Sequence, residues 1–338
     1  ETLPHERLSP RSDTVARRLA VLRRLAHPEL DVAATGERPD GAARAQAGPI
    51  RALVVPVRAL LQPVVAGLGD LEPVSARSGE ARSMESLVSA LVAAAYTRVD
   101  MVEKRGDFAV RGGILDVFPP TEDHPLRIDF WGEEIEEIRW FAVADQRSLE
   151  VAPDGLWAPP CRELLLTPAV RERALALRDV LPGAVDMLEK MAEGIAVEGM
   201  ESLTPALVDS MVAILDLVDP DSLLVLADPE RIRRRAHDLV ATTHEFLAAA
   251  WTSAAAGGSV PLDLSAASFL TLADARAAAA RRGLGRWSLT HFGGDAELGS
   301  VGEDDDDAGS LVDSDVTTLR LAARDVEGYR GDIERAVA

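Results

Sequence analysis

The clearest strand-and-turn signal in this sequence lies between Arg105 and Phe141, which reads RGDFAVRGGILDVFPPTEDHPLRIDFWGEEIEEIRWF. Apolar residues alternate before the Gly112-Gly113 pair and resume after it, and glycine tolerates the positive φ of a tight turn. A second alternation follows, with Leu126, Ile128 and Phe130 on one face of the predicted strand. The stretch therefore predicts a compact antiparallel β unit of about three or four strands.

The outward face of that second strand is unusual, because it carries Arg127 and Trp131 with Arg111 nearby across the glycine turn. Exposed arginine and tryptophan close together are typical of protein-binding hot spots. The alternative is a second apolar layer that covers Trp131, with the arginines in surface ion pairs. The pattern of residues leaves both interpretations open.

The composition of the whole chain restricts its function. The 338 residues, of which 47% are hydrophobic, predict roughly two to four domains with sizeable cores. The formal charge of −20 makes the chain a poor general ligand for nucleic acid. The sole cysteine, Cys161, excludes an internal disulfide and a cysteine-built zinc site, and we expect it to pack in a core.

The sequence carries no recognisable targeting segment. No apolar run approaches the ~20 residues of a membrane span and no signal peptide is visible, so we expect a cytoplasmic protein without membrane contact. The chain begins on Glu1 and not on methionine, and it ends within a helical pattern at residues 335–338. These ends predict a piece of a longer polypeptide.

The sequence on either side of the β unit alternates short apolar strands with amphipathic helices, which is typical of an α/β fold. Buried strands are predicted at residues 52–57 and 223–227, each followed by a helix. The other predicted helices are 15–25 after a cap within 12–14, 84–95, 168–176, 185–192, 203–214, 230–250 and 262–283. Further short strands are predicted at 164–166, 287–292 and 317–321, a surface loop at 28–48, a connector at 145–160 and an acidic linker at 293–315.

Motifs for nucleotide or metal chemistry are missing from the sequence. No GxxxxGK[ST] phosphate loop occurs, and Gly112-Gly113 is not followed by Lys-Ser/Thr. His237 and His244 lie seven residues apart on one predicted helix, which is not the spacing of a metal-binding pair. The acidic residues between Glu133 and Glu137 are interpreted as solvated charges that protect a strand edge, not as acid/base groups. The sequence therefore predicts a binding module without catalytic residues, cofactor or metal.

Four stretches carry a resemblance to a known family. Residues 96–120 read YTRVDMVEKRGDFAVRGGILDVFPP, and the supporting stretches are ETLPHERLSP at 1–10, FWGEEIEEIRWFAVADQRSL at 130–149 and CRELLLT at 161–167. Together they resemble the N-terminal UvrB-like region of bacterial transcription-repair coupling factors (Mfd), over most of residues 1–290.

The resemblance implies a fold and its boundaries. It implies an α/β fold with a degenerate RecA-like (UvrB-like) domain, split in sequence by an inserted small antiparallel β domain, plus the start of a further small domain. The implied segments are 1–83 for the C-terminal part of the first RecA-like half, 84–153 for the inserted β domain, 154–290 for the second half, 291–316 for an acidic flexible linker and 317–338 for the start of a truncated following domain. A RecA-like domain that has lost its nucleotide site agrees with the missing phosphate loop.

The resemblance also implies a function. In the family the inserted domain binds UvrA and so recruits nucleotide excision repair to RNA polymerase stalled at DNA damage. The family's UvrA-contacting positions fall here on Arg111, Arg127 and Trp131, and the aromatic is often Phe in the family. The ATP- and Mg-dependent DNA translocase, a helicase-like hydrolase, and the contacts to RNA polymerase and DNA belong to downstream regions. No enzymatic activity and no cofactor are therefore implied for this segment.

Two other hypotheses remain open from the sequence. One is a nucleotide-dependent DNA-processing enzyme active within this segment, which ATP hydrolysis by the isolated chain would support. Residues 84–153 argue against it, because they hold 14 acidic and 7 basic residues, a net charge of −7, whereas nucleic-acid faces are basic. The other is that the rest of the full protein masks the Arg111/Arg127 face. Equal UvrA affinity of this chain and of a full-length chain would exclude masking.

Overall fold

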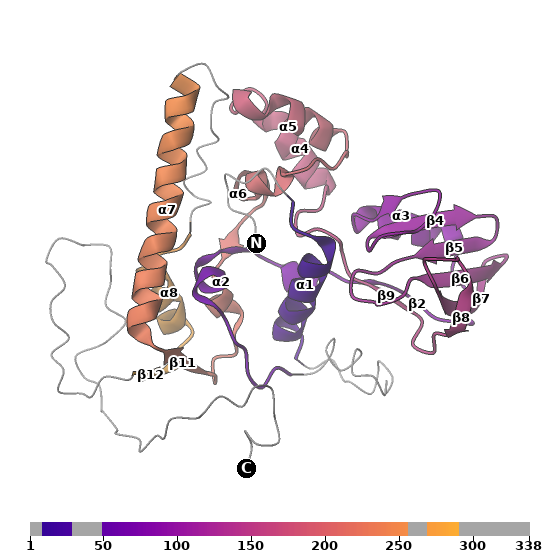
Figure 1. Cartoon of the computed structure of the whole chain (residues 1–338), viewed down its shortest axis with the longest axis horizontal. Helices are drawn as coiled ribbons and strands as arrows, with labels where there is room; N and C mark the ends of the chain where they lie inside the picture. Colours follow the sequence, from indigo (N-terminus) through magenta and orange to yellow (C-terminus); the bar gives the residue numbers. More distant parts are fainter. Residues whose placement is uncertain (1–8, 29–48, 256–268, 291–338) are drawn as a thin grey trace, which may run out of the picture.

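The computed structural model describes residues 9–28, 49–255 and 269–290, which form a mixed α/β fold with several small sheets. Figure 1 shows a β unit on one side, a helical group above the centre and a long helix on the far side. The helices are α1 Ser12–Ala26, α2 Val57–Leu61, α3 Met84–Ala93, α4 Pro168–Leu177, α5 Val185–Ala192, α6 Thr204–Leu207, α7 Pro229–Ala255 and α8 Leu272–Arg281, with 3-10 turns η3 Leu68–Asp70, η4 Pro182–Ala184, η5 Met200–Leu203 and η6 Ile214–Leu217. The strands are β1 Val64–Val65, β2 Val74–Ala76, β3 Thr97–Arg98, β4 Asp107–Arg111, β5 Ile114–Val117, β6 Leu126–Trp131, β7 Glu134–Phe141, β8 Ser148–Val151, β9 Leu156–Ala158, β10 Met211–Val212, β11 Leu223–Ala227 and β12 Gly285–Leu289.

The β unit is built on a six-stranded sheet of order β3-β4-β5-β6-β7-β8, in which every neighbouring pair is antiparallel except β3 and β4. The predicted apolar face is confirmed, since Leu126 and Ile128 are buried and Phe130 packs against the same core. Helix α3 covers this face through Leu87 and Leu91. The three or four strands expected within residues 105–141 are confirmed as β4 to β7, and the sheet is extended by β3 and β8, which lie outside that stretch. Strand β8 is exposed along its whole length and has no apolar alternation to mark it.

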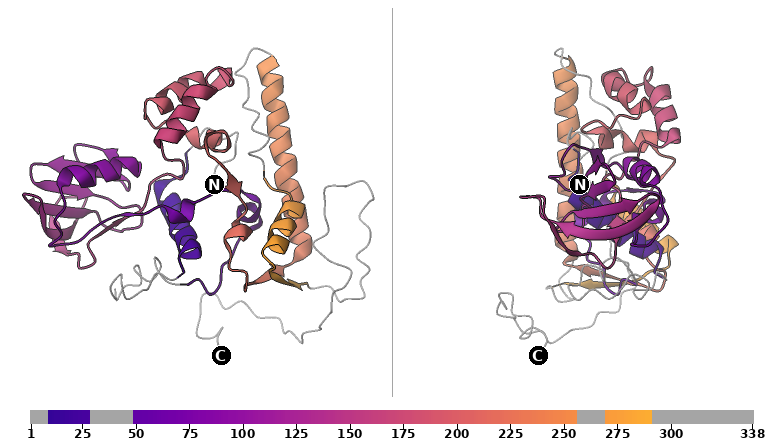
Figure 2. Two further views of the ribbon diagram at one scale, coloured as in Figure 1. Left: turned by 180° about the vertical axis from the view of Figure 1, so that it is seen from behind. Right: turned by 90° about the vertical axis from the view of Figure 1, so that its right-hand side faces the viewer.

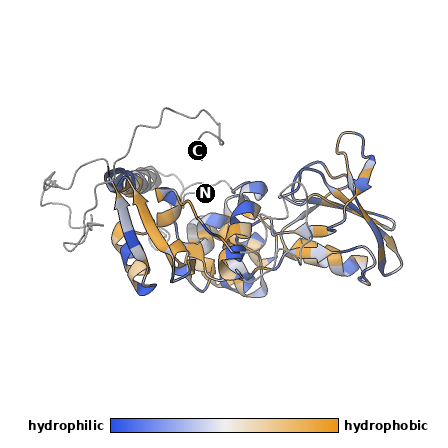
Figure 3. Cartoon of the chain, turned by 90° about the horizontal axis from the view of Figure 1, so that it is seen from below, coloured by the Kyte–Doolittle hydropathy of each residue, from blue (hydrophilic) through white to orange (hydrophobic). Residues whose placement is uncertain are grey.

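The chain reaches and leaves the β unit through two strands that pair with each other. Strand β2 is antiparallel to β9, with Ala76 opposite Leu156. Figure 2 shows the β unit standing at one side of the molecule, and Figure 3 shows it from below at one end. The predicted connector at 145–160 was therefore wrong in part, since it contains β8 and β9.

The pairing of β2 with β9 depends on the absence of a side chain at Gly155. This residue has a φ of +72°, and a Cβ there would lie 2.2 Å from the carbonyl oxygen of Ala76. We expect Gly155→Ala to lower the free energy of unfolding by at least about 2 kcal/mol. The matched control is Gly79→Ala, whose φ of +79° is similar but whose Cβ would meet nothing within 4 Å. Gly79→Ala should lower the free energy of unfolding by only about 1 kcal/mol. Urea denaturation measures both variants, and an equal loss of stability in the two would contradict the steric argument.

The helical group forms a separate apolar cluster. Thr167 caps α4 by accepting a hydrogen bond from the Val170 amide, and Pro168 occupies the first turn as predicted. Helices α4 and α5 pack around Leu188 and Met191. The prediction of a continuous helix over 203–214 was wrong. The 3-10 turn η5 ends at Leu203, α6 ends at Leu207, and strand β10 follows.

The remaining part combines α1, α2, α7 and α8 with two small sheets. Strand β1 is antiparallel to β10, and β11 is parallel to β12, with Leu223 opposite Gly285. The predicted strand at 223–227 is thus confirmed. The strand predicted at 287–292 forms as β12, which begins at Gly285 and ends at Leu289. The cap predicted for α1 was wrong, because Ser12 lies inside the helix and its hydroxyl donates to the Arg105 carbonyl of the β unit.

Two predicted strands do not form. Residues 52–56 are irregular, Val54 is exposed and Pro56 has no amide hydrogen to pair, so only the following helix α2 is confirmed. Residues 164–166 are also irregular, and Leu164 instead packs in the helical group. The predicted linker at 293–315 and the strand at 317–321 lie outside the described residues, as does nearly all of the predicted loop at 28–48.

The core position expected for Cys161 is confirmed. It is buried in the main cluster of the β unit, and its amide donates to the Ala94 carbonyl. Burial raises the pKa of the Cys161 thiol to about 12. We expect DTNB to label this thiol more than about a thousandfold faster in guanidinium than in the native chain at pH 8, because little thiolate forms in the core. Equal labelling rates would show that the thiol is open to solvent.

Candidate partner-binding site

Two tight hairpin turns meet at one end of the six-stranded sheet. Gly112, with a φ of +60°, and Gly113 connect β4 to β5, and Gly132, with a φ of +65°, turns β6 into β7. The Phe130 amide donates to the Gly113 carbonyl at 2.9 Å, which holds the two turns side by side. Trp131 therefore stands next to the glycine turn, and it is 79% exposed.

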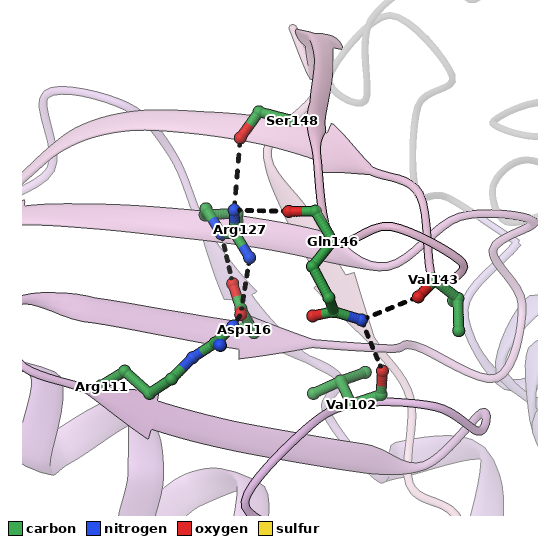
Figure 4. Close-up of polar contacts among 7 residues, drawn as sticks. All are labelled: Val102, Arg111, Asp116, Arg127, Val143, Gln146 and Ser148. Atoms are coloured by element: carbon green, nitrogen blue, oxygen red, sulfur yellow. Dashed lines mark hydrogen bonds and ion pairs between the residues drawn. The ribbon is translucent and has the colours of Figure 1, made fainter.

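A fully buried carboxylate lies on the outward face behind this tip. Asp116 has an exposed fraction of 0%, and in the sheet register it lies opposite Arg127. Arg127 reaches it with two hydrogen bonds, from Nε to Oδ1 at 2.8 Å and from Nη2 to Oδ2 at 3.0 Å. Nη2 of Arg111 donates to the same Oδ2 from the other side. Figure 4 shows both arginines converging on Asp116.

Arg127 is held on several sides and its side chain is only 14% exposed. Its Nη1 donates to the Gln146 carbonyl at 3.1 Å and to Ser148 Oγ at 3.4 Å, and its guanidinium stacks 4.7 Å from the Phe141 ring centroid. Gln146, which has a positive φ, is itself fixed by hydrogen bonds to the Val102 and Val143 carbonyls (Figure 4). Hydrogen bonding to Asp116 raises the pKa of Arg127 above its ordinary value.

The two arginines therefore have different roles in the free protein. Arg111 is 45% exposed, and only its Nη2 has a hydrogen-bond partner among the described residues. Its Nε and Nη1 groups are free to donate to a partner. All three guanidinium nitrogens of Arg127 already donate within the β unit.

The structure decides between the two interpretations of the outward face. A second small core does exist, and it consists of Val102, Ala109, Phe118 and Phe141. This core covers the part of the face behind Arg127 and leaves Trp131 exposed. The expectation that an apolar layer covers Trp131 is wrong. The arginines do form ion pairs, but with the fully buried Asp116 and not at the surface as expected, and the hot-spot interpretation stays a prediction.

Asp116 was missed in the sequence. The signal was present, because an aspartate stands among apolar residues in a predicted buried strand, ILDV at 114–117. A charge in such a place requires a partner. The pairing of β5 with β6 supplies Arg127 from eleven residues away.

The acidic residues that follow Trp131 line the rim of the tip. Glu134 lies opposite Trp131, and Glu137 pairs with Arg139. The interpretation that these charges protect a free strand edge was wrong, because the edge of β7 at Glu134 is paired with Ala81 and the Arg82 amide donates to the Glu133 carbonyl. They give the tip a negative rim next to the exposed indole.

The described part of the chain offers neither a metal site nor a membrane-spanning helix. Within residues 9–28, 49–255 and 269–290, no cluster of His, Cys, Asp or Glu side chains could hold a metal ion. None of the described helices combines the length and the apolar character needed to cross a membrane.

Comparisons with known proteins identify relatives of this region. Residues 74–155 match the UvrB interaction domain. The chain is 48% identical over 315 residues to the transcription-repair-coupling factor of Mycobacterium tuberculosis (strain CDC 1551 / Oshkosh), a match that covers 88% of the chain and 24% of that protein. The corresponding Bacillus subtilis (strain 168) protein is 29% identical over 181 residues, which cover 48% of the chain and 15% of the relative.

A second kind of relative matches a shorter part of the chain. The UvrABC system protein B of Natronomonas pharaonis is 28% identical over 145 residues, which cover 41% of the chain and 21% of that protein. The chain spans about a quarter of the length of the Mycobacterium tuberculosis coupling factor. The resemblance predicted from the sequence is confirmed.

Proposed function

We propose that this chain, a homologue of transcription-repair-coupling factors over 88% of its length, is a UvrB-like recruitment module that binds UvrA and so brings nucleotide excision repair to stalled RNA polymerase. The observation that carries the proposal is that the exposed indole of Trp131 and the partly exposed Arg111 belong to the same sheet, within the segment that matches the UvrB interaction domain. An aromatic anchor next to an arginine is the usual composition of a protein-binding hot spot.

The proposed architecture is a degenerate RecA-like domain interrupted by the β unit. The antiparallel pairing of β2 with β9 supports an insertion, because the chain leaves and returns at neighbouring positions. We propose the boundaries 1–83, 84–153 and 154–290 for the first half, the inserted domain and the second half, with a linker at 291–316 and a following domain from 317.

The other activities are proposed for the longer protein to which this segment is similar. That protein is proposed to be a cytoplasmic ATP- and Mg-dependent translocase that contacts DNA and displaces stalled RNA polymerase through other regions. For this segment we propose binding without nucleotide hydrolysis. The negative rim of the tip and the net charge of −7 over residues 84–153 favour a protein partner over DNA.

The experiment that tests the proposal measures binding of purified UvrA to the 338-residue chain by calorimetry. We expect binding that is lost in the combined Arg111→Ala/Trp131→Ala variant, because both side chains point away from the core of the β unit. Trp287→Ala is the matched control, since Trp287 is also largely exposed but lies on β12, outside the β unit. Absence of binding by the unmodified chain, or equal binding by the combined variant, would refute the proposal.

A further inference from the structure

We propose that Asp116 is a positioning residue for UvrA binding: it touches no partner and holds the Arg111 guanidinium in the orientation that UvrA recognises. This inference rests on the proposed function. The observation behind it is that one fully buried carboxylate accepts hydrogen bonds from both arginines of the candidate site.

Asp116 is itself held in a single orientation. Arg127 donates a hydrogen bond to each carboxylate oxygen of Asp116. Arg127 is in turn held by the Phe141 ring, the Gln146 carbonyl and the Ser148 hydroxyl. Oδ2 is therefore presented at one place on the outward face, where Nη2 of Arg111 donates to it. The position of Arg111 is set by this chain of contacts through β5, β6 and β8.

Holding Arg111 prepares it for binding. An exposed arginine loses rotamer freedom when a partner orders it, and a side chain that is ordered beforehand avoids most of that loss. Only one donor group of Arg111 is used by Asp116, so Nε and Nη1 remain for a carboxylate of the partner. Asp116 carries one negative charge and receives hydrogen bonds from two arginines, so the three side chains sum to +1, which favours an acidic group of UvrA.

A double-mutant cycle separates positioning from simple structural support. We expect Asp116→Asn to weaken UvrA binding about fivefold to tenfold in the otherwise unchanged chain, and less than about twofold when Arg111→Ala is already present. A residue that only stabilises the β unit would weaken binding equally in both backgrounds, and that result would overturn the inference.

The matched control is Glu201→Gln. Glu201 is also a nearly buried carboxylate that accepts from an arginine, Arg162, and from Ser9 Oγ, but it lies in the helical group. We expect this variant to lower the melting temperature and to leave UvrA affinity unchanged. A loss of affinity equal to that of Asp116→Asn would make the effect one of general stability and overturn the inference.

A measurement on the unmodified chain covers the case in which Asp116→Asn does not fold. Hindered rotation of a held guanidinium separates its Nη proton resonances in NMR, so we expect resolved Nη signals for Arg111 in the free chain. A single averaged signal would show that Arg111 is not held and would overturn the inference. Failure of the unmodified chain to bind UvrA would instead refute the proposed function.

Discussion

Replacement of Trp131 by alanine is expected to weaken UvrA binding at least about 30-fold, because a central aromatic anchor commonly contributes 2 kcal/mol or more to an interface. The indole is 79% exposed in the free chain, so almost all of its apolar surface remains to be buried by a partner. The same exposure means that the variant should unfold at an unchanged temperature. Calorimetry measures the UvrA affinity of this variant, and differential scanning fluorimetry measures its melting temperature on the same sample.

The control for this test is a second exposed tryptophan, Trp287. Trp287→Ala removes a similar area from a residue that is 64% exposed on β12, and it should leave UvrA affinity unchanged. Trp131→Phe should retain most of the affinity, because a ring of similar shape remains at the tip. A loss of affinity in Trp287→Ala, or none in Trp131→Ala, would place the UvrA contact elsewhere.

Strand β6 shows which features of the site could be predicted from the sequence and which could not. The alternation of Leu126 and Ile128 with Arg127 predicted which side is buried, because side chains of a strand point to alternate faces. The exposed position of Trp131 could not be decided, because the second core around Phe141 is assembled from segments far apart in the sequence. The alternation of residues within β6 alone carries no information about packing between such distant segments.

The errors in the strand predictions have the same cause. Residues 52–57 have the composition of a buried strand but find no neighbouring strand among the described residues, whereas the exposed β8 is a strand because it pairs with β7. Strand formation depends on a partner as much as on local preference. In the same way, the pairing of Asp116 with Arg127 becomes visible only once β5 and β6 lie side by side.

The structure changes the expected effect of removing Arg127. If Arg127 were only a surface contact for UvrA, as the resemblance implies, Arg127→Ala would abolish UvrA binding without lowering the melting temperature. Arg127 is instead the main partner of a fully buried carboxylate, and truncation would leave Asp116 with Arg111 alone. We expect Arg127→Ala to destabilise the β unit by about 3 kcal/mol, since the buried carboxylate then keeps a single ion-pair partner, the partly exposed Arg111, and loses both hydrogen bonds from Arg127.

Hydrogen exchange can locate this loss within the chain. Amides of β4, β5 and β6 should exchange faster in Arg127→Ala, while those of α5, in the separate helical cluster, should be unchanged. Any weakening of UvrA binding in this variant would then arise from a less stable β unit as well as from a lost contact. Trp131→Ala is the contrasting case, because it should alter binding and leave exchange unchanged.

A second substitution tests whether the buried charge is the cause. Asp116→Asn introduced into Arg127→Ala removes the buried negative charge that has lost its main partner and should recover at least about 1 kcal/mol of stability in the β unit. UvrA affinity should stay low in this double variant, because nothing then fixes Arg111. If Arg127→Ala leaves exchange in β4–β6 unchanged, or if the second substitution lowers stability further, Arg127 acts at the surface and the buried pair does not support the β unit.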